Sequence, residues 1–345
     1  MPKLETAGRK APHWSVVCLL TVTILGAVPV ALGVVAGGGG ALTSPSVLIP
    51  VTRPAPALAA ATPVRVPTPD IRVPLDARTL LALFAEKRYR VEDVRAGTAA
   101  VPRVVLASLP EDLAALDSIE DRKSLFMKAM LPLILMVNED VLRDRERLEL
   151  LHRQRVGGYV LAPKDRFWLA RLAERYGVPF TGEVDTAALM ARVDAVPPSL
   201  ALAQAVEESG WGTSRFAQDG NALFGQLTWN ERHAGIVPRD RQPGETHRFR
   251  AFEDPLDSVR SYVHNLNTHR AYRQFRALRA TLRKQDKPLD GFKLAAALER
   301  YSERGPDYVR TLRAVMRSNA LQEFDAAVLE AGEGDPVVIR AAVTR

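Results

Sequence analysis

The hydrophobic positions divide the chain into segments of different character. Residues 14–36 form an almost unbroken apolar run, and residues 37–75 follow with four consecutive glycines and eight prolines. From residue 76 onward, apolar side chains recur at spacings of three and four, the period of helices packed on a core. Residues 326–345 carry two glycines and a proline instead of this pattern. We therefore expect an apolar leader, a linker, a folded body over residues 76–325 and a loosely held tail at 326–345.

The apolar run at 14–36 is long enough to cross a bilayer, since about twenty apolar residues span one as a helix. Arg9 and Lys10 precede it, which favours a cytoplasmic location for residues 1–13. A secretory signal peptide has a shorter apolar core and a small-residue cleavage site. We expect a single-span inner-membrane anchor with the body facing the periplasm. The alternative is cleavage of this segment, which would leave a periplasmic protein.

The linker at 37–75 has a composition that disfavours regular structure. Its prolines lack a backbone N–H and favour the extended polyproline conformation, so we expect neither helix nor sheet there. Fully extended at about 3 Å per residue, it lets the body reach roughly 100 Å from the membrane. This reach suits a substrate that lies away from the bilayer.

The first part of the body, residues 76–196, has the pattern of a helical region. Asp76 is placed to cap a first helix, and the longest apolar periodicity of the chain runs from Ser118 to Arg155. A short β-like stretch at 101–106 lies between them. We expect this part to be mostly helical.

The second part, residues 197–325, begins with a short buried helix. Pro197 and Pro198 fit a first helical turn, and the Ser199 hydroxyl is suited to cap it. Gly210 and Gly212 are natural stops because glycine accepts the left-handed conformation that ends helices. The helix predicted between them consists almost entirely of apolar residues and good helix formers.

Charged and apolar residues alternate in the next segment, residues 226–252, around a Pro-Gly turn. This pattern predicts a short, charged β-hairpin. Helical patterns then resume up to residue 324. The predicted fold class is mainly α, an α+β body with a small β-hairpin lobe, preceded by a transmembrane segment and a Pro-rich linker.

An acidic pair, Glu207 and Glu208, falls in the last turn of the helix predicted after Pro197. The helix C-terminus carries a partial negative charge, and apolar neighbours offer little water, so both effects raise the pKa of a carboxyl group there. A glutamic acid that keeps its proton near neutral pH is suited to general acid catalysis. Ala201 and Ala205 would leave room on its face for a ligand, with Gln204 as a neutral hydrogen-bonding partner. The alternative interpretation is a pair of ordinary solvated charges at a helix end.

The chain around this pair reads AQAVEESGWGTSRFA over residues 203–217 and GNALFGQ over residues 220–226. This signature resembles that of bacterial peptidoglycan N-acetylglucosaminidase domains, most closely the Bax-type branch, which is similar to glycoside hydrolase family 73. The resemblance covers roughly residues 76–325. It implies a lysozyme-like fold, with Glu208 as the proton donor to the glycosidic oxygen.

A second catalytic group is harder to select from the sequence. In glycosidases, a second group stabilises or replaces the positive charge that develops at the sugar carbon. The resemblance implies that this group is an acid on the β lobe. We favour Glu245, which follows the Pro-Gly turn, over the alternatives Glu231, Asp240 and Glu253. Each also has the plain interpretation of a solvated charge. The resemblance further assigns Tyr301 a role near the substrate's acetamido group, although the spacer that follows it departs from the family pattern.

The remaining candidate residues are polar or aromatic side chains within the matching region. Asn221 is suited either to hold an N-acetyl group or to cap a turn, and Trp229 is better suited than Trp211 to stack on a sugar ring. His264 belongs to a stretch typical of the Bax-type branch. The predicted substrate-binding residues are Gln204, Asn221, Phe224, Trp229, His264 and Tyr308.

Composition narrows the function classes. The formal net charge is +7, but residues 1–75 supply +4 of it, so the body carries too little excess to require a nucleic-acid partner. The single cysteine, Cys18, lies in the apolar run, which excludes a catalytic thiol and a cysteine-rich zinc site in the body. We expect no cofactor and no metal. The predicted function is a peptidoglycan hydrolase acting on a β-1,4 bond at N-acetylglucosamine, with glycan strands as its partner. The alternatives are a lytic transglycosylase and a non-catalytic glycan-binding or scaffold protein.

Overall fold

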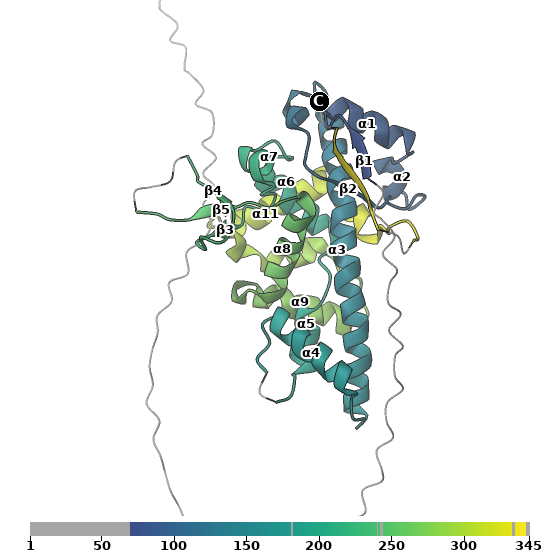
Figure 1. Cartoon of the computed structure of the whole chain (residues 1–345), viewed down its shortest axis with the longest axis vertical. Helices are drawn as coiled ribbons and strands as arrows, with labels where there is room; N and C mark the ends of the chain where they lie inside the picture. Colours follow the sequence, from purple (N-terminus) through teal and green to yellow (C-terminus); the bar gives the residue numbers. More distant parts are fainter. Residues whose placement is uncertain (1–69, 181, 240, 242–243, 333–334, 343–345) are drawn as a thin grey trace, which may run out of the picture.

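The computed structural model describes residues 70–342, apart from 181, 240, 242–243 and 333–334. One long helix, α3 (Ile119–Val156), runs through the molecule, and the other elements lie along it (Figure 1). Ser118 caps it by accepting from the Asp121 N–H. Arg153 and Arg155 lie in the last turn, beside the negative end of the helix dipole. Most side chains from Leu125 to Val141 are buried. The helix is therefore the core element against which both parts of the body pack.

A small parallel sheet forms one end of the molecule. Its strands are β1 (Asp70–Val73), β2 (Val104–Leu106) and β6 (Val337–Ala341), in the order β1-β6-β2. All pairs are parallel, with Asp70 opposite Val338 and Val104 opposite Val337. Two predictions were wrong here: the end of the predicted linker forms β1, and part of the predicted loose tail forms the central strand β6. Ile339 explains the second difference, because its side chain is fully buried and holds the tail against the core.

The other elements are mostly helical, as predicted. The α-helices are α1 (Ala77–Glu86), α2 (Val91–Arg95), α4 (Pro163–Arg175), α5 (Thr186–Arg192), α6 (Pro198–Ser209), α7 (Arg215–Gly220), α8 (Pro255–Thr268), α9 (Arg273–Lys284), α10 (Gly291–Leu294) and α11 (Pro306–Ser318). Short 3-10 turns are η1 (Glu111–Ala115), η2 (Arg270–Tyr272), η3 (Ala295–Ala297), η4 (Glu299–Tyr301) and η5 (Leu321–Ala326).

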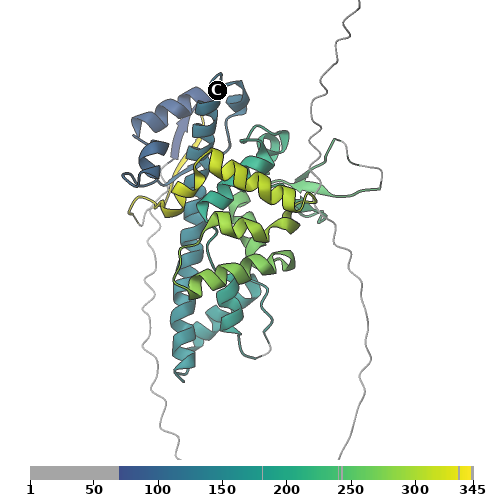
Figure 2. The same cartoon turned by 180° about the vertical axis from the view of Figure 1, so that it is seen from behind.

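Helix α6 lies at the centre of the second part of the body. It contacts α3, α10, α11 and η5, and Figure 2 shows the last helices crossing it on the side away from α3. Every residue from Pro198 to Val206 is buried. The predicted cap was wrong in detail, because Ser199 lies inside the helix. Its N–H and hydroxyl both donate to the Asp325 carboxylate, each at 2.8 Å, so a residue of η5 caps α6 instead.

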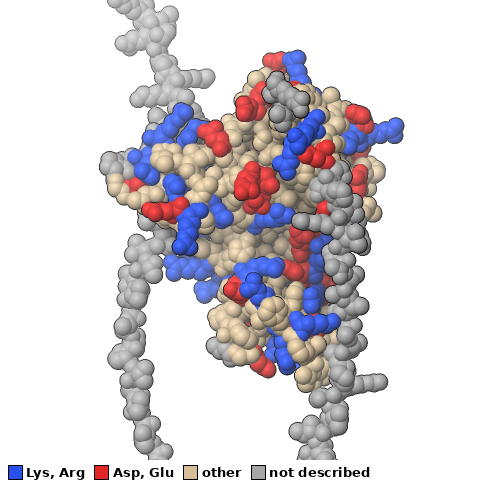
Figure 3. Space-filling model, in the orientation of Figure 1, with Lys and Arg blue, Asp and Glu red and all other residues tan. Residues whose placement is uncertain are grey.

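The predicted β-hairpin is a three-stranded antiparallel sheet. Its strands are β3 (Leu227–Thr228), β4 (Gly235–Ile236) and β5 (Arg248–Arg250), in the order β3-β5-β4. The sheet projects from the helical body (Figure 1). The Phe249 ring of β5 anchors it there by packing 4.0 Å from the Phe216 ring of α7. Basic and acidic side chains are interspersed over the face shown in Figure 3.

A buried charge cluster fixes the chain just before α6. Asp194 accepts from Arg283 at 2.8 Å and lies within 3.7 Å of Arg279, whose side chain is 1% exposed. Arg279 also donates to the backbone carbonyls of Asp194 and Ala195. Nearby, Asn138 of α3 exchanges two hydrogen bonds with the Val196 backbone. These contacts tie α3 and α9 to the segment that starts α6.

Within residues 70–342, as far as they are described, no helix has the length and apolar character needed to cross a membrane. The predicted cytoplasmic segment 1–13, the span at 14–36 and the linker up to residue 69 lie outside the described residues.

Candidate active site

Glu208 lies at the C-terminal end of α6, where the chain turns sharply. Gly210 ends the helix with φ 59°, and Trp211 and Gly212 follow with φ 58° and 76°. A Cβ atom on Gly212 would lie 2.7 Å from the Leu109 side chain, so the turn needs glycine for space as well as for backbone conformation. The predicted helix end is confirmed. This turn lets the helix stop immediately after Glu208 and leaves the side chain half-buried.

A chain of hydrogen bonds from three helices ends on the Glu208 carboxyl group. Tyr262 of α8 donates to Gln204 Oε1 at 2.7 Å, and Gln204 Nε2 donates to the Tyr308 hydroxyl at 3.0 Å. Tyr308 of α11 then donates to Glu208 Oε1 at 2.8 Å. The side chains of Tyr262, Gln204 and Tyr308 are all buried. Because each group in this chain donates to the next, Oε1 is an acceptor, and the proton of Glu208 belongs on Oε2.

Gly225 determines what can surround Oε2. A Cβ atom at this position would lie 2.6 Å from Glu208 Oε2, and the backbone has φ 60°. Both observations favour glycine here. The neighbouring Phe224 carbonyl accepts from the Tyr301 hydroxyl at 2.8 Å, which holds the loop in place. The backbone of this loop therefore approaches the acid closely.

Burial raises the pKa of Glu208 from its ordinary 4.5 to about 7. The Tyr308 hydrogen bond and the Arg304 charge act in the opposite direction, while the neighbouring Glu207 charge adds to the increase. A carboxyl group with this pKa keeps a large share of its protons at neutral pH and can deliver one to a leaving oxygen. The geometry therefore fits the predicted general acid.

Three tyrosines form a stack beside the acid. The Tyr301 and Tyr308 rings are 5.6 Å apart and nearly parallel, and the tilted Tyr272 ring lies 5.8 Å from that of Tyr301. Tyr301 is 4% exposed, and its hydroxyl is bonded to the Phe224 carbonyl. The structure thus places Tyr301 and Tyr308 together with Glu208, with Tyr301 in a position that supports the loop.

Gln204 and Phe224 also lie in this cluster, but behind the acid. Gln204 is fully buried and bonded to two tyrosines, and Phe224 stacks on Tyr262 at 4.0 Å. The expectation that Ala201 and Ala205 leave room for a ligand was wrong, because both are fully buried against protein. These residues support the site from inside the core.

Three other predicted substrate-binding residues lie apart from this cluster. Asn221 ends α7 with φ 50°, and its amide donates to the carbonyls of Phe252 and Glu253, so it holds that loop. Trp229 follows β3, is 52% exposed and has its ring 6.4 Å from that of His247. His264 packs 5.8 Å from Tyr176 and lines a separate cavity of about 600 Å³. Since His264 is two residues after Tyr262 on α8, it points to the opposite side of the helix.

The described residues show no contact between Glu208 and any predicted second acid. Glu245 lies on the β lobe with its side chain 41% exposed, 3.8 Å from His247. Glu231 and Glu253 are exposed, and Asp240 lies outside the described residues. The assignment of Glu245 stays a prediction.

Sequence reasoning missed three residues of the cluster. Tyr262 lies in a region for which only helical patterns were predicted, and Gly225 is part of the signature but has no predicted role of its own. Arg304, from the spacer that departs from the family pattern, bonds to Glu207. A tyrosine in an otherwise aliphatic stripe is a signal for Tyr262, because a buried hydroxyl needs a hydrogen-bond partner.

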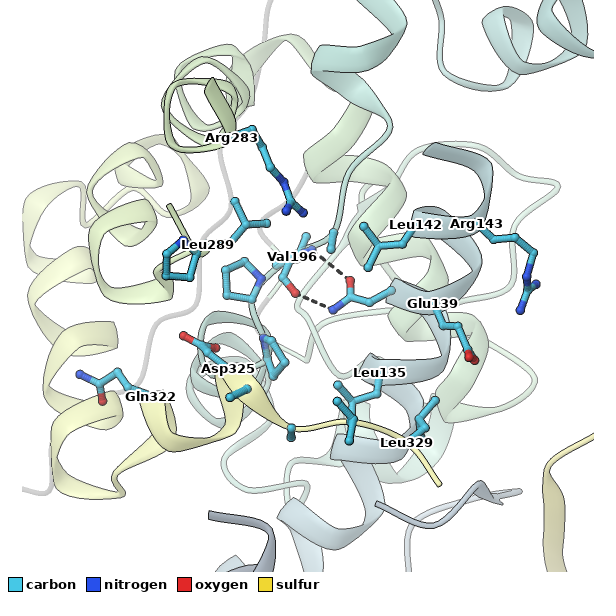
Figure 4. Close-up of a pocket in the computed structure, with 18 of the residues that line it drawn as sticks. Leu135, Glu139, Leu142, Arg143, Val196, Arg283, Leu289, Gln322, Asp325 and Leu329 are labelled. Atoms are coloured by element: carbon cyan, nitrogen blue, oxygen red, sulfur yellow. Dashed lines mark hydrogen bonds between the residues drawn. The ribbon is translucent and has the colours of Figure 1, made fainter. Parts of the chain in front are cut away.

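A cavity of about 850 Å³ lies at the other end of α6 (Figure 4). Leu135, Val196 and Leu289 line it, and the charged groups at its edge include Asp325 and Arg283. Asp325 caps α6 and Arg283 pairs with Asp194, so both already have protein partners. We therefore place the candidate active site at Glu208 and not in this cavity.

Comparison with known proteins identifies the family of the chain. The family model Glucosaminidase, described as mannosyl-glycoprotein endo-beta-N-acetylglucosaminidase, matches residues 184–321, which include Glu208, Tyr301 and Tyr308. Protein bax of Escherichia coli (strain K12) is 35% identical over 216 residues, which are 62% of this chain and 75% of that protein. The chain belongs to the glucosaminidase family, in the branch of protein bax.

The predicted family is thereby confirmed, and it indicates a glycosidase that degrades peptidoglycan. Among solved structures, the catalytic domain of the autolysin Auto from Listeria monocytogenes is similar to 51% of this chain and is covered over 96% of its own length. The identity is 16% and the TM-score 0.30.

Proposed function

We propose that this protein hydrolyses the β-1,4 glycosidic bond of peptidoglycan at N-acetylglucosamine, with Glu208 as the general acid. The observation that carries the proposal is the directed hydrogen-bond chain that ends on Glu208 Oε1, combined with burial that raises the pKa of the group to about 7. Family membership supports the substrate class.

In the proposed reaction, the proton on Glu208 Oε2 moves to the glycosidic oxygen as the bond to the sugar carbon breaks. The Glu208 carboxylate that results keeps the Tyr308 hydrogen bond on Oε1, and such a bond is stronger to a charged acceptor. Tyr308 cannot turn away easily, because Gln204 and Tyr262 hold it in the buried chain. Water then adds to the sugar carbon and leaves a reducing end, while the proton that the water loses passes to a carboxylate of the site and restores the acid.

The proposal is tested by digesting purified peptidoglycan with the full-length chain and with Glu208→Gln. We expect reducing N-acetylglucosamine ends from the wild type, and a loss of about 100-fold or more in the variant, because general acid catalysis contributes about 10²–10⁴-fold. Glu174→Gln, an exposed change on α4, is the matched control. Unchanged release by Glu208→Gln would contradict the assignment.

The second acid is tested in the same assay. We propose Glu245 for this role, because it lies between β4 and β5. These strands belong to the lobe that projects from the helical body (Figure 1). Glu245→Gln should then lose hydrolysis while Glu231→Gln and Glu253→Gln retain it. Loss in one of the other two variants instead would transfer the role to that residue.

A lytic transglycosylase is the second candidate, because the described residues show no contact between Glu208 and any of the acids predicted for the second role. That reaction leaves anhydro sugar ends, which mass analysis of the same digest separates from reducing ends. A third outcome, in which the folded chain binds peptidoglycan without releasing fragments, would identify a binding or scaffold protein.

We also propose that residues 14–36 anchor the chain in the inner membrane with the body in the periplasm. The length of the apolar run and the basic residues before it support this. Fractionation of cells with a tag at residue 345 is the test. Full-length protein in the membrane fraction that is sensitive to protease in spheroplasts fits an anchor, whereas a shortened soluble form indicates cleavage.

A further inference from the structure

Arg304 connects Glu207, the residue before the acid, to α11. One guanidinium nitrogen donates to Glu207 Oε1, and the other donates to Thr311 Oγ1 at 2.6 Å. The Thr311 hydroxyl in turn donates to the Asp307 carbonyl at 3.0 Å. The guanidinium also lies 5.8 Å from the centre of the Tyr308 ring. Arg304 is therefore held in one place by the helix that carries the tyrosine bonded to Glu208.

Glu207 and Glu208 are adjacent carboxyl groups at the C-terminal end of α6, a position that is already unfavourable for negative charge. The Glu207 side chain is 10% exposed, so water screens its charge poorly, and the Arg304 side chain is 42% exposed. The titratable groups facing Glu208 are Glu207 on α6, Tyr262 on α8, Tyr308 on α11 and Arg304 from the loop before α11. Arg304 is the positive charge in this set.

We propose that Arg304 and Glu207 form a charge-compensating pair that sets the pH range over which Glu208 keeps its proton. The proposal rests on the proposed role of Glu208 as the acid. Arg304 does not need to touch substrate for this. It acts through Glu207, and so it is a positioning residue rather than a catalytic one.

The two partners have opposite effects on Glu208. Loss of Arg304 leaves the Glu207 carboxylate uncompensated beside Glu208, which disfavours a second negative charge and raises the pKa of Glu208. Loss of Glu207 leaves the Arg304 charge uncompensated, which favours the Glu208 carboxylate and lowers its pKa. A purely structural role for the pair would not produce shifts of opposite sign.

The test is an NMR titration of the full-length chain labelled with ¹³C at the glutamate side-chain carboxyl. The Glu208 signal is assigned by its absence in Glu208→Gln. We expect Arg304→Gln to raise the pKa of Glu208 by about one unit and Glu207→Gln to lower it by about one unit. The double variant should return close to the wild-type value, because both charges are then absent.

Two further variants control for folding and for unspecific charge effects. Arg304→Lys keeps the positive charge and should stay close to the wild-type value even if Arg304→Gln folds poorly. Arg310→Gln removes an arginine of α11 that pairs with Asp307, and it should leave Glu208 unchanged. Shifts of the same sign in Arg304→Gln and Glu207→Gln, or no shift in either, would overturn the proposal.

The pH profile of peptidoglycan digestion gives an independent comparison. Activity should decrease at high pH as Glu208 loses its proton. The pH at which it decreases should follow the pKa of Glu208 from NMR, so it should be higher in Arg304→Gln and lower in Glu207→Gln. If the chain releases no fragments at all, the proposed function fails, but the NMR titration still decides whether the pair controls Glu208.

Discussion

At the residue scale, the arrangement around Glu208 places a poorly solvated acid where it costs stability. Burial raises its pKa to about 7, so the folded protein holds this proton more tightly than the unfolded chain does. The free energy of unfolding therefore falls as the pH rises from about 4.5 to about 7, by at most roughly 3 kcal/mol. The burial that suits Glu208 to its proposed role as an acid therefore lowers the free energy of unfolding at neutral pH.

This effect predicts that Glu208→Gln is more stable than the wild type at alkaline pH. Glutamine has no charge to lose, so the variant should unfold at higher denaturant concentration at pH 8, and the two proteins should converge near pH 4. Urea unfolding of both chains at the two pH values is the measurement. A constant difference across this range would contradict a raised pKa in the folded state.

Gly225 gives a second prediction at this scale. Gly225→Ala adds a Cβ atom 2.6 Å from Glu208 Oε2 and strains a backbone with φ 60°. We expect digestion of peptidoglycan to fall by at least about tenfold, since small misplacements of an acid have effects of this size or larger. Gly158→Ala, just after α3, also has positive φ (78°) and open space around its Cβ, so it is the matched control. Equal losses in both variants would assign the effect to backbone strain.

At the scale of elements, local signals predicted where helices begin and end. Asp76 predicted the start of α1, and Gly210 predicted the end of α6, because caps and left-handed glycines act on residues close in sequence. The cap of α6 could not be predicted in this way. Asp325 reaches it from 126 residues away, and nothing near Ser199 indicates that partner.

The Asp325 cap can be tested by substitution. Asp325→Ala removes the acceptor of the Ser199 N–H and hydroxyl, so we expect a loss of about 1–3 kcal/mol in the free energy of unfolding. Chemical denaturation measures this loss. Gln322→Ala, an exposed change in the same turn, should cost little. If the two variants behave alike, the cap does not stabilise α6.

At the scale of the whole molecule, a buried charge cluster joins parts that are distant in sequence. Asp194 connects the segment before α6 to Arg279 and Arg283 of α9. Its burial alone would raise the pKa of Asp194, but the Arg283 hydrogen bond and the charges of Arg279 and Arg145 lower it below the ordinary value. Sequence analysis could not find this cluster, because an arginine-rich helix has the pattern of a solvated surface.

We predict that Asp194→Asn destabilises the protein by about 3–5 kcal/mol, because Arg279 is left buried without a counterion. The ion pairs of the Asp194 carboxylate contribute fully above pH 3.8, and their contribution is lost as the pH falls through the lowered pKa of Asp194. The two proteins should therefore become more similar in stability as the pH decreases below 3.8. Denaturation at pH 7 and at a series of decreasing acid pH values tests both statements. The exposed Asp219→Asn is the control, and a cost equal to that of Asp194→Asn would contradict the prediction.

Some residues of the candidate site could be predicted from the sequence, and others depend on the tertiary structure. Glu208 was predicted through the signature, and Tyr301 and Tyr308 through the wider family resemblance. The tertiary structure places Gln204 and Phe224 behind the acid. Asn221 and His264 belong to the matching region, but the fold uses the first to hold a loop and turns the second to the far side of α8. Orientation around a helix and pairing across the core depend on the assembled molecule.

The position of β6 has a consequence for the order in which the chain is assembled. This strand lies between β1 and β2, so Asp70 has its neighbour only when Val338 is present. A ribosome makes residue 338 long after residue 70. Strands β1 and β2 therefore have no β6 to pair with through most of synthesis and any export. The small sheet closes last, and a chain that is interrupted near its end lacks it altogether.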